Sequence, residues 1–225
     1  MGAAAGPNIV EDGLVLALDA GNTQSYPGSG TTWSDLTSNS HDLTLTNGPT
    51  YSSTDGGIFD FDGTDDYATT SGSSTVSINA SQDFSFDAWI KIDDGGINSI
   101  SNIGDYYLSS GFVFYTAITT RNLSVYTNNA LAFSSGAVTL NTWAHVAFSR
   151  SGSTVTVYLN TSSVGTFTHS AALSGQFDLA ISKYNGSYSN AINGKISNAK
   201  LYIGKALTAS EIQQNYTALK GRYGY

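Results

Sequence analysis

The sequence predicts an all-β protein, a two-sheet antiparallel sandwich with one short C-terminal helix. Apolar and polar residues alternate with a period of two in many short segments, which is the pattern of strands with one face in a core. Tyrosine and threonine are abundant and only 12% of the residues are charged, a composition that favours strands and tight turns over helices. The chain has 225 residues, which suits one large sandwich. We therefore expect a single domain over residues 13–225, preceded by an N-terminal segment, residues 1–12.

The clearest strand covers residues 84–92, FSFDAWIKI, where the phenylalanines and isoleucines share one face and polar residues share the other. We expect this strand to be half-buried. Residues 143–150 and 154–160 show the same alternation, and we expect them to pair as a hairpin across residues 151–153. The other segments expected as strands are 14–18, 43–45, 58–61, 67–69, 76–78, 111–117, 123–126, 164–167, 177–181 and 195–203.

One helix is expected near the C-terminus, over about residues 209–220. Thr208 and Glu211 have the spacing of a capping box, in which each side chain accepts a hydrogen bond from the other residue's backbone N–H. Gly221 lies where a left-handed C-terminal cap is expected. We expect the helix to lie against the sandwich through its apolar side chains Ile212, Tyr216 and Leu219.

Charge and cysteine content exclude several classes of function. Nine Lys and Arg residues stand against 17 Asp and Glu residues, a formal net charge of −8, which is the opposite of what binding to nucleic-acid phosphates needs. The chain has no cysteine, so disulfides, cysteine-based metal sites and a thiol nucleophile are excluded. No stretch approaches about 18 consecutive apolar residues, and the first residues lack a basic region followed by a long apolar one. We expect neither a nucleic-acid partner nor a membrane span or signal peptide.

Residues suited to catalysis are few. The two glutamates are Glu11, in the N-terminal segment, and Glu211, in the capping box, so a pair of glutamates flanking a sugar bond is not expected. His41, His145 and His169 lie far apart and form neither a zinc motif nor a nucleophile–base pair. We interpret His145 as a histidine that is hydrogen-bonded on a sheet face. We assign no catalytic residue and expect no enzyme.

An acidic cluster around FDFDGTDDY is the best candidate for a metal site. Calcium takes several carboxylate and carbonyl oxygens from a flexible turn. The alternative is a turn at Gly63 whose aspartates cap backbone amides and face water. The candidate residues are Asp55, Asp60, Asp62, Asp65 and Asp66.

Tyrosines near expected loops offer a second kind of site, a platform on which sugar rings stack. The alternative is that the aromatic residues fill the core and the sheet faces, as most do in sandwiches. Tryptophans at 33, 89 and 143 have no common spacing that would direct them to one ligand. The tyrosines considered for the platform are Tyr106, Tyr107, Tyr184 and Tyr188.

Six segments, read in order, resemble a known family: GLVLALDAGNTQSYPGSGTTWSDL, LTLTNGPTY, FDFDGTDDY, FSFDAWIKI, TWAHVAFSRSGSTVTVYLN and INGKISNAKLYIGKALTASEIQQNY. The pattern is similar to the laminin-G-like jelly rolls of the concanavalin A-like lectin/glucanase superfamily over about residues 13–221. Its first and last segments look most like the copies carried in virion proteins of tailed bacteriophages, especially marine ones. The family commonly has Asp-Gly where this chain has Asn160 and Thr161, and Asp-Glu where it has Ser197 and Asn198, so part of the acidic set associated with family calcium sites is missing.

The resemblance implies a non-enzymatic virion structural protein, a jelly roll on the surface of a capsid or tail that contacts other virion proteins or copies of itself. Residues 1–12 and the residues after Lys220 are then expected to be attachment elements. The alternative is a carbohydrate-binding adhesin that recognises a host-surface glycan, with a secreted hydrolase remnant as a third possibility. Aromatic residues from loops that converge in a groove would favour the adhesin, and an extensive interface through the terminal segments would favour the virion role.

Overall fold

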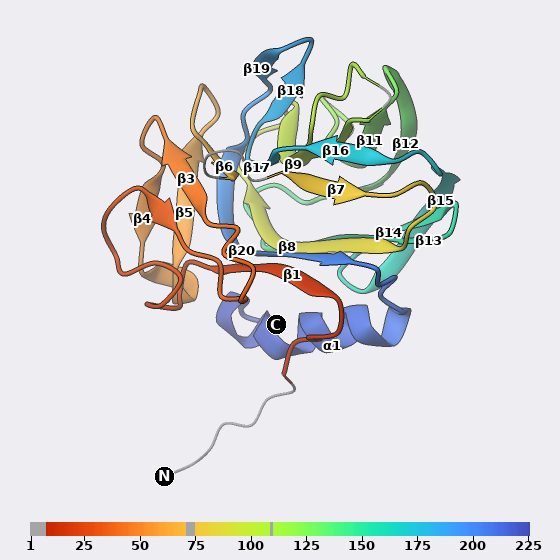
Figure 1. Ribbon diagram of the computed structural model, residues 1–225. Helices are drawn as coiled ribbons and strands as arrows, with labels where there is room; N and C mark the ends of the chain where they lie inside the picture. Colours follow the sequence, from red (N-terminus) through yellow and green to blue (C-terminus); the bar gives the residue numbers. More distant parts are fainter. Residues whose placement is uncertain (1–7, 71–74, 109) are drawn as a thin grey trace.

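Two large antiparallel sheets pack face to face in the computed structural model, which describes residues 8–70, 75–108 and 110–225 (Figure 1). Sheet A runs from edge to edge through β15 (Ser162–Thr168), β14 (Thr154–Leu159), β13 (Ala144–Ser151), β8 (Phe84–Ile92), β20 (Asn193–Ile203), β5 (Ile58–Asp62) and β4 (Thr50–Ser52), and β1 (Leu14–Asp19) also pairs with β20. Sheet B runs through β12 (Ala130–Ala137), β11 (Asn122–Thr127), β10 (Phe112–Thr116), β9 (Asn98–Ile103), β17 (Phe177–Leu179), β6 (Tyr67–Thr70), β3 (Leu43–Thr46) and β2 (Thr32–Trp33). Two short pairs complete the strands: β7 (Val76–Ile78) with β16 (Leu173–Gly175), and β18 (Ser182–Tyr184) with β19 (Ser187–Ser189).

This arrangement confirms the predicted two-sheet antiparallel sandwich with one C-terminal helix, α1 (Ala209–Leu219). Short 3-10 helices lie at η1 (Thr54–Gly56) and η2 (Lys220–Tyr223). Each strand expected from the sequence overlaps an observed one, and the hairpin of β13 and β14 forms as predicted. The strands that the sequence did not predict are β2, β4, β9, β12, β16, β18 and β19. In the described part of the chain, no helix is long and apolar enough to cross a membrane.

Phenylalanine rings from both sheets fill the space between them. The ring of Phe86 in β8 stacks on Phe148 of β13 at 5.7 Å between centroids and meets Phe114 of sheet B edge-on at 6.3 Å. Phe84 meets Phe112 edge-on at 5.8 Å. All five side chains are fully buried. The alternation seen in the sequence therefore marks the side of each strand that faces the core.

The prediction that residues 84–92 form a half-buried strand is wrong. Asp87 and Trp89 point away from the core, yet both are fully buried. The reason is α1 and η2, which cover the outer face of sheet A (Figure 1). Asn215 of α1 donates from Nδ2 to Asp87 Oδ2 at 2.7 Å, and the Tyr223 ring of η2 stacks on Trp89 at 4.3 Å between centroids. The helix is thus one layer of the fold, with buried contacts on the sheet beneath it.

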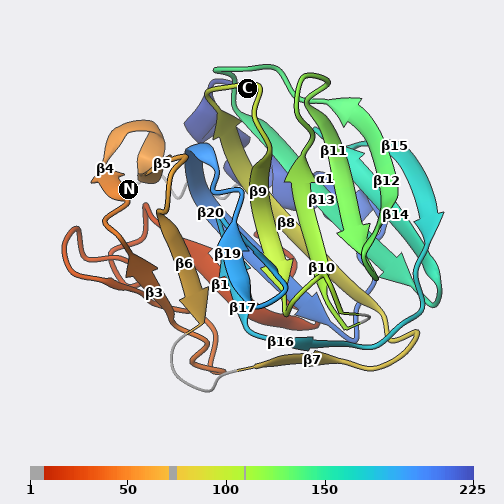
Figure 2. The same cartoon turned by 90° about the horizontal axis from the view of Figure 1, so that it is seen from above.

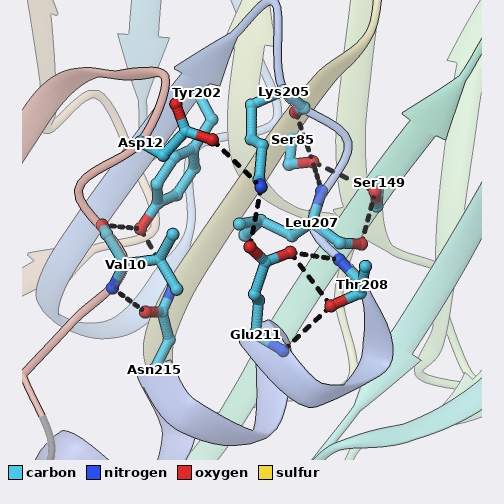
Figure 3. A network of polar contacts seen from close by, with 10 residues as sticks. All are labelled: Val10, Asp12, Ser85, Ser149, Tyr202, Lys205, Leu207, Thr208, Glu211 and Asn215. Atoms are coloured by element: carbon cyan, nitrogen blue, oxygen red, sulfur yellow. Dashed lines mark hydrogen bonds and ion pairs between the residues drawn. The ribbon is translucent and has the colours of Figure 1, made fainter.

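The predicted capping box begins the helix (Figure 3). Thr208 Oγ1 accepts from the N–H of Glu211 at 3.3 Å, and Glu211 Oε2 accepts from the N–H of Thr208 at 2.8 Å. The prediction of a left-handed cap at Gly221 is wrong: the chain continues into η2, and the left-handed residue is Gly224, with φ 81°. Because η2 continues the chain by a further turn, Tyr223 packs on Trp89 of sheet A, and the left-handed residue follows at Gly224 instead of Gly221. The helix contacts the sandwich through the predicted side chains Ile212, Tyr216 and Leu219.

Residues 8–12 of the expected N-terminal attachment segment lie on the jelly roll, whereas residues 1–7 lie outside the described residues. Val10 is buried between α1 and β20. Its N–H donates to Asn215 Oδ1 at 2.8 Å, and its carbonyl accepts from Tyr202 Oη at 3.1 Å (Figure 3). Asp12 adds an ion pair with Lys205 at 3.1 Å. The described part of the segment therefore shares the polar network that holds α1 in place.

Candidate functional site

A cavity of about 300 Å³ opens on the outer face of sheet B. Sheet B lies on the side of the sandwich opposite α1 (Figures 1 and 2). Strands β9, β10 and β11 supply the floor of the cavity, and the β18–β19 pair supplies a wall. Along β10, Phe112 and Phe114 face the core, so Val113 and Tyr115 face the cavity, as the period of a strand requires. We call it the tyrosine cavity, and its lining residues are Ile97, Ser99, Tyr106, Val113, Tyr115, Tyr126, Ser182, Tyr184 and Asn190.

The wall of the tyrosine cavity is a tight hairpin that is tied to the neighbouring loop. Asn185 and Gly186 connect β18 to β19, both with positive φ, as in the two-residue turns that suit a hairpin. The carboxylate of Asp105 accepts from the N–H of Asn185 at 2.9 Å and from the N–H of Gly186 at 2.6 Å. The N–H of Tyr106 donates to the carbonyl of Lys183 at 3.1 Å. These bonds fix Tyr106 and the hairpin relative to each other.

The ring of Tyr106 contacts two other tyrosine rings of the cavity. Tyr106 lies 5.2 Å from Tyr184 and 5.3 Å from Tyr126, measured between ring centroids. Tyr126 Oη donates to the carbonyl of Asn129 at 3.2 Å. Burial raises the pKa of Tyr106 and of Tyr115, so both phenols stay protonated at neutral pH. The cavity therefore offers aromatic faces together with hydroxyl groups, the combination that suits a ligand with both apolar and polar surfaces.

Large apolar side chains that are exposed gather around the same opening. Tyr107 contacts the ring of Tyr184 at 5.2 Å and is 42% exposed, and Leu108 follows it in the same loop. Leu131 of β12 is the cross-strand partner of Tyr126 and is 57% exposed. Ile97 belongs to the lining. Exposed apolar groups that cluster in this way indicate a binding surface.

A second cavity, of about 380 Å³, adjoins the first and shares Ile97 and Asn190 with it. Among its lining side chains, Asp94 accepts from the N–H of Gly96 at 2.8 Å and from the side-chain amides of Asn98 at 3.2 Å and Asn193 at 2.9 Å. Burial raises the pKa of Asp94, but these hydrogen bonds outweigh it and leave the pKa below its ordinary value. We call this hollow the Asp94 cavity, and its other lining residues are Gly63, Thr64, Ile118 and Ala191.

The structure brings together three of the five acidic residues proposed as a metal site. Carboxylate oxygens of Asp62, Asp65 and Asp66 lie within 4.8 Å of one another. Asp55 instead accepts from Trp143 Nε1 at 3.0 Å, and Asp60 pairs with Lys195 at 3.2 Å.

Two of the three clustered carboxylates, those of Asp62 and Asp66, already bind the backbone of the turn. Asp62 accepts from the N–H of Thr64 at 2.8 Å, and Asp66 accepts from the N–H of Asp62 at 3.2 Å. The bond from Thr64 is the main cause of the lowered pKa of Asp62. Asn160 and Ser197, which replace acids of the family pattern, bind the N–H of His145 and the carbonyl of Gly57. The clustered carboxylates therefore all belong to one turn, and oxygens of Asp62 and Asp66 are already engaged by its backbone.

The other candidate chemical groups lie away from the two cavities. His145 Nε2 lies 3.3 Å from Asp87 on the outer face of sheet A, fully buried beneath α1, in agreement with its interpretation as a structural histidine. His169 Nδ1 lies 3.2 Å from Arg150. Glu211 is held by the capping box and by Lys205 at 2.7 Å. Among the described lining residues of the tyrosine cavity there is no carboxylate.

Of the tyrosines considered from the sequence, Tyr106 and Tyr184 line the cavity and Tyr107 lies at its edge. Tyr188 instead stacks on Tyr67 at 4.8 Å between centroids. The sequence did not point to Tyr115 and Tyr126. The alternation in the β10 segment could have marked Tyr115 as facing away from the core, and the Asn-Gly pair could have revealed the hairpin. The tryptophans Trp33, Trp89 and Trp143 are all buried.

Comparison with known families gives one match. Residues 62–213 match the family described as the concanavalin A-like lectin/glucanases superfamily. No curated protein matches the sequence.

Solved structures with the same fold include several proteins of low identity. Domain 4 of a GH43 extracellular arabinanase from Geobacillus stearothermophilus, in complex with arabinotriose, has a TM-score of 0.70 and 17% identity, covering 93% of this chain and 100% of that one. A sialidase from Trypanosoma rangeli, in complex with sialic acid, has a TM-score of 0.70 and 15% identity, covering 100% of this chain but 36% of that one. The binding domain of Paraclostridial Mosquitocidal Protein 1 has a TM-score of 0.64 and 14% identity, covering 89% of this chain and 51% of that one. At these identities the likeness shows a shared fold.

Proposed function

The chain belongs to the concanavalin A-like lectin/glucanases superfamily, and from this premise we propose that it is a carbohydrate-binding module whose ligand occupies the tyrosine cavity. The observation that carries the proposal is the convergence of Tyr106, Tyr115, Tyr126 and Tyr184 on one hollow of the outer face of sheet B. Sugar rings present apolar C–H faces and polar hydroxyl edges, and tyrosines match both. One similar domain was solved with arabinotriose, which supports a glycan as the ligand class.

The binding experiment uses a panel of soluble oligosaccharides, with isothermal titration calorimetry on the intact chain. Tyr184→Ala and Tyr126→Ala should each weaken glycan binding at least about tenfold, or roughly 1.4 kcal/mol, because each removes an aromatic face from the cavity. Tyr225→Ala is the matched control, since Tyr225 is also an exposed tyrosine but contacts Trp143 beneath η2. Glycan binding that survives Tyr184→Ala unchanged, or no binding to any member of the panel, would contradict the proposal.

The module acts by binding alone, without catalysis. In support, the described lining of the tyrosine cavity has no acid that could protonate a leaving group. Glu211 is engaged by Thr208 and Lys205. Incubation with each bound glycan should release no shorter product, as measured by chromatography. Release that is abolished by Asp94→Asn, with binding retained, would show that the protein is an enzyme.

A second candidate function is that of a virion structural protein on the particle surface. The arrangement of the molecule favours it in one respect. Residues 8–12 and α1 lie on the side of sheet A, and sheet B, whose strands β9, β10 and β11 line the tyrosine cavity, lies on the opposite side (Figure 1). Attachment to other virion proteins through the side of α1 would leave the cavity facing outward, where a host-surface glycan could reach it.

Purified particles provide the test of this second function. We expect the chain to co-sediment with them in a fixed stoichiometry. Deletion of residues 1–7 should weaken its incorporation and leave the melting temperature unchanged, whereas deletion of residues 1–12 should also destabilise the fold, because it removes Val10 from its contacts with Asn215 and Tyr202. Normal incorporation of the chain that lacks residues 1–7 would show that these residues are not the attachment element.

A further inference from the structure

We propose that the tyrosine cavity and the Asp94 cavity form one continuous groove that binds a linear, uncharged oligosaccharide across both, rather than a single sugar or an acidic one. This inference rests on the proposed function, since it concerns the same site. The continuity follows from the shared side chains Ile97 and Asn190, each of which lines both cavities. Cavities of about 300 Å³ and 380 Å³ together fall in the range of roughly 300–1,000 Å³ that ligand sites occupy.

The two ends of the groove offer different contacts to a sugar chain. The tyrosine end offers aromatic faces, and Ile118 at the other end is 61% exposed. The Asp94 end offers side-chain amides whose orientation is fixed. Asn98 Oδ1 accepts from the N–H of Asn193 at 2.7 Å, while Asn193 Nδ2 donates to Asp94 at 2.9 Å.

Fixed amides of this kind suit recognition of sugar hydroxyls. An asparagine side chain has two N–H groups and an oxygen that accepts two hydrogen bonds, so the contact of Asn193 with Asp94 leaves capacity for a ligand. A hydroxyl both donates and accepts, and each sugar unit carries several. The ligand unit in the tyrosine cavity is therefore held by ring stacking, and the next unit is held by hydrogen bonds to the Asp94 cavity.

The charges along the groove favour an uncharged ligand. Among the described lining residues of both cavities, Asp94 is the one charged side chain, and no lysine, arginine or histidine is present. The lowered pKa of Asp94 keeps it ionised at neutral pH. The turn that carries Asp62 enters the lining through Gly63 and Thr64 and brings further negative charge. An acidic sugar would place its carboxylate against like charges with no cation to offset them. The likeness to a sialidase fold therefore gives no reason to expect sialic acid here.

The experiment measures chain-length and charge dependence with defined probes. Arabinose, xylose and glucose are compared with their linear pentamers, and a pentamer of galacturonic acid and 3′-sialyllactose are the acidic probes, with lactose as the neutral match for the latter. We expect at least one neutral pentamer to bind ten times or more tightly than its monosaccharide. The acidic probes should bind at least tenfold more weakly than the neutral pentamer.

Variants assign these effects to the Asp94 cavity. Asn193→Ala and Ile118→Ser should each bring the affinity of the pentamer down toward that of the monosaccharide without changing monosaccharide binding. Asn39→Ala is the matched control, because it removes an exposed side-chain amide that donates to the carbonyl of Val15 and lines neither cavity. It should not change the affinity for the pentamer or for the monosaccharide. Asp94→Asn should reduce the difference in affinity between the neutral and the acidic probes. Melting temperatures of all variants report on folding.

The outcomes separate this inference from the function on which it rests. Equal binding of pentamer and monosaccharide, no effect of Asn193→Ala and Ile118→Ser, or preference for an acidic probe would overturn the inference, while loss of binding in Tyr184→Ala would still support the tyrosine cavity. If no probe binds, the proposed function and this inference fail together.

Discussion

Replacing Asp87 by asparagine is the sharpest test of how α1 is held on sheet A. Asp87 of β8 is fully buried. Its carboxylate accepts from Lys200 Nζ at 2.8 Å and Asn215 Nδ2 at 2.7 Å, and lies 3.3 Å from His145 Nε2. Burial alone would raise its pKa, but Lys200 and then His145 outweigh burial and hold the pKa of Asp87 well below its ordinary value. The carboxylate is therefore ionised in the folded protein, and it is the charge that balances Lys200.

The expected loss follows from the charge that Asp87→Asn leaves behind. Lys200 is 3% exposed, so its ammonium group would stay buried without an opposite charge. Breaking a buried pair in this way costs about 3–5 kcal/mol. Lys200 also donates to Asn198 Oδ1 at 3.1 Å, and this bond would remain in Asp87→Asn. We therefore expect the free energy of unfolding to fall by about 3 kcal/mol, the low end of that range.

The pH dependence of this loss has a defined sign. A lowered pKa in the folded state contributes stability above the pKa of the unfolded chain, about 4 for an aspartate, and that stability is lost as the pH falls below it. The free energies of unfolding of the wild type and Asp87→Asn should therefore begin to converge below about pH 4 and approach each other further as the pH falls toward the folded-state pKa of Asp87.

Urea unfolding at pH 7 and at steps down to pH 3 measures both effects. Asp60→Asn is the matched control, because Asp60 pairs with Lys195 at 3.2 Å and its side chain is 43% exposed. A surface pair of this kind contributes about 0–1 kcal/mol. If Asp87→Asn costs no more than Asp60→Asn, or if its stability falls with pH in parallel with the wild type, the buried pair does not hold α1 on the sheet.

Three further predictions concern the core, a buried histidine and the acidic turn. Phe86→Ala should lower the free energy of unfolding by about 3–5 kcal/mol, because the ring is fully buried between the sheets; a loss below about 1 kcal/mol would show that it does not fill the core. Burial, and then Arg150, lower the pKa of His169 to about 4, below the unfolded value of about 6.5, so stability should fall by roughly 3 kcal/mol between about pH 6.5 and about pH 4. His169→Gln should flatten that slope in urea titrations, and an unchanged slope would assign it to other groups. Calorimetry should give the same melting temperature in excess calcium and in chelator, because oxygens of Asp62 and Asp66 already bind backbone N–H groups of their own turn; a rise in calcium that Asp62→Asn abolishes would establish the site.

How far the sequence predicts this fold depends on what covers each strand. Where one face meets the core and the other meets water, alternation is clear, and β14 was predicted with bounds that differ by one residue. In β9, NSISNI, both faces are buried, and four of the six residues are polar. The side chain of Asn102, on its outer face, donates a hydrogen bond to Asp178 Oδ2 at 2.9 Å. A buried polar side chain with a hydrogen-bond partner can therefore occupy a position where we would look for an apolar residue. No local sequence pattern predicts such a strand, because the residues that bury its outer face come from segments distant in sequence.

The sequence predicted only part of the site, Tyr106 and Tyr184 but not Tyr115 and Tyr126, for a related reason. Tyr106, Tyr126 and Tyr184 come from a loop, a strand and a hairpin that only the register of sheet B brings together. A local signal existed for the hairpin itself, the pair Asn185 and Gly186. A turn signal predicts that two strands meet, but it does not predict which sheet face they cover.

The two outer faces of the sandwich differ in a way that supports placing the proposed ligand site on sheet B. On sheet A, α1 is fixed by charged and amide groups that are fully buried, such as Asp87 and Asn215. Opening that face would leave these groups without partners, which costs several kcal/mol. On sheet B, a hairpin held by hydrogen bonds to Asp105 and Tyr106 stands beside β9, β10 and β11, and the space next to it is a cavity lined with tyrosines. A ligand can therefore enter on sheet B without breaking the packing of the fold, whereas on sheet A it would have to displace a helix.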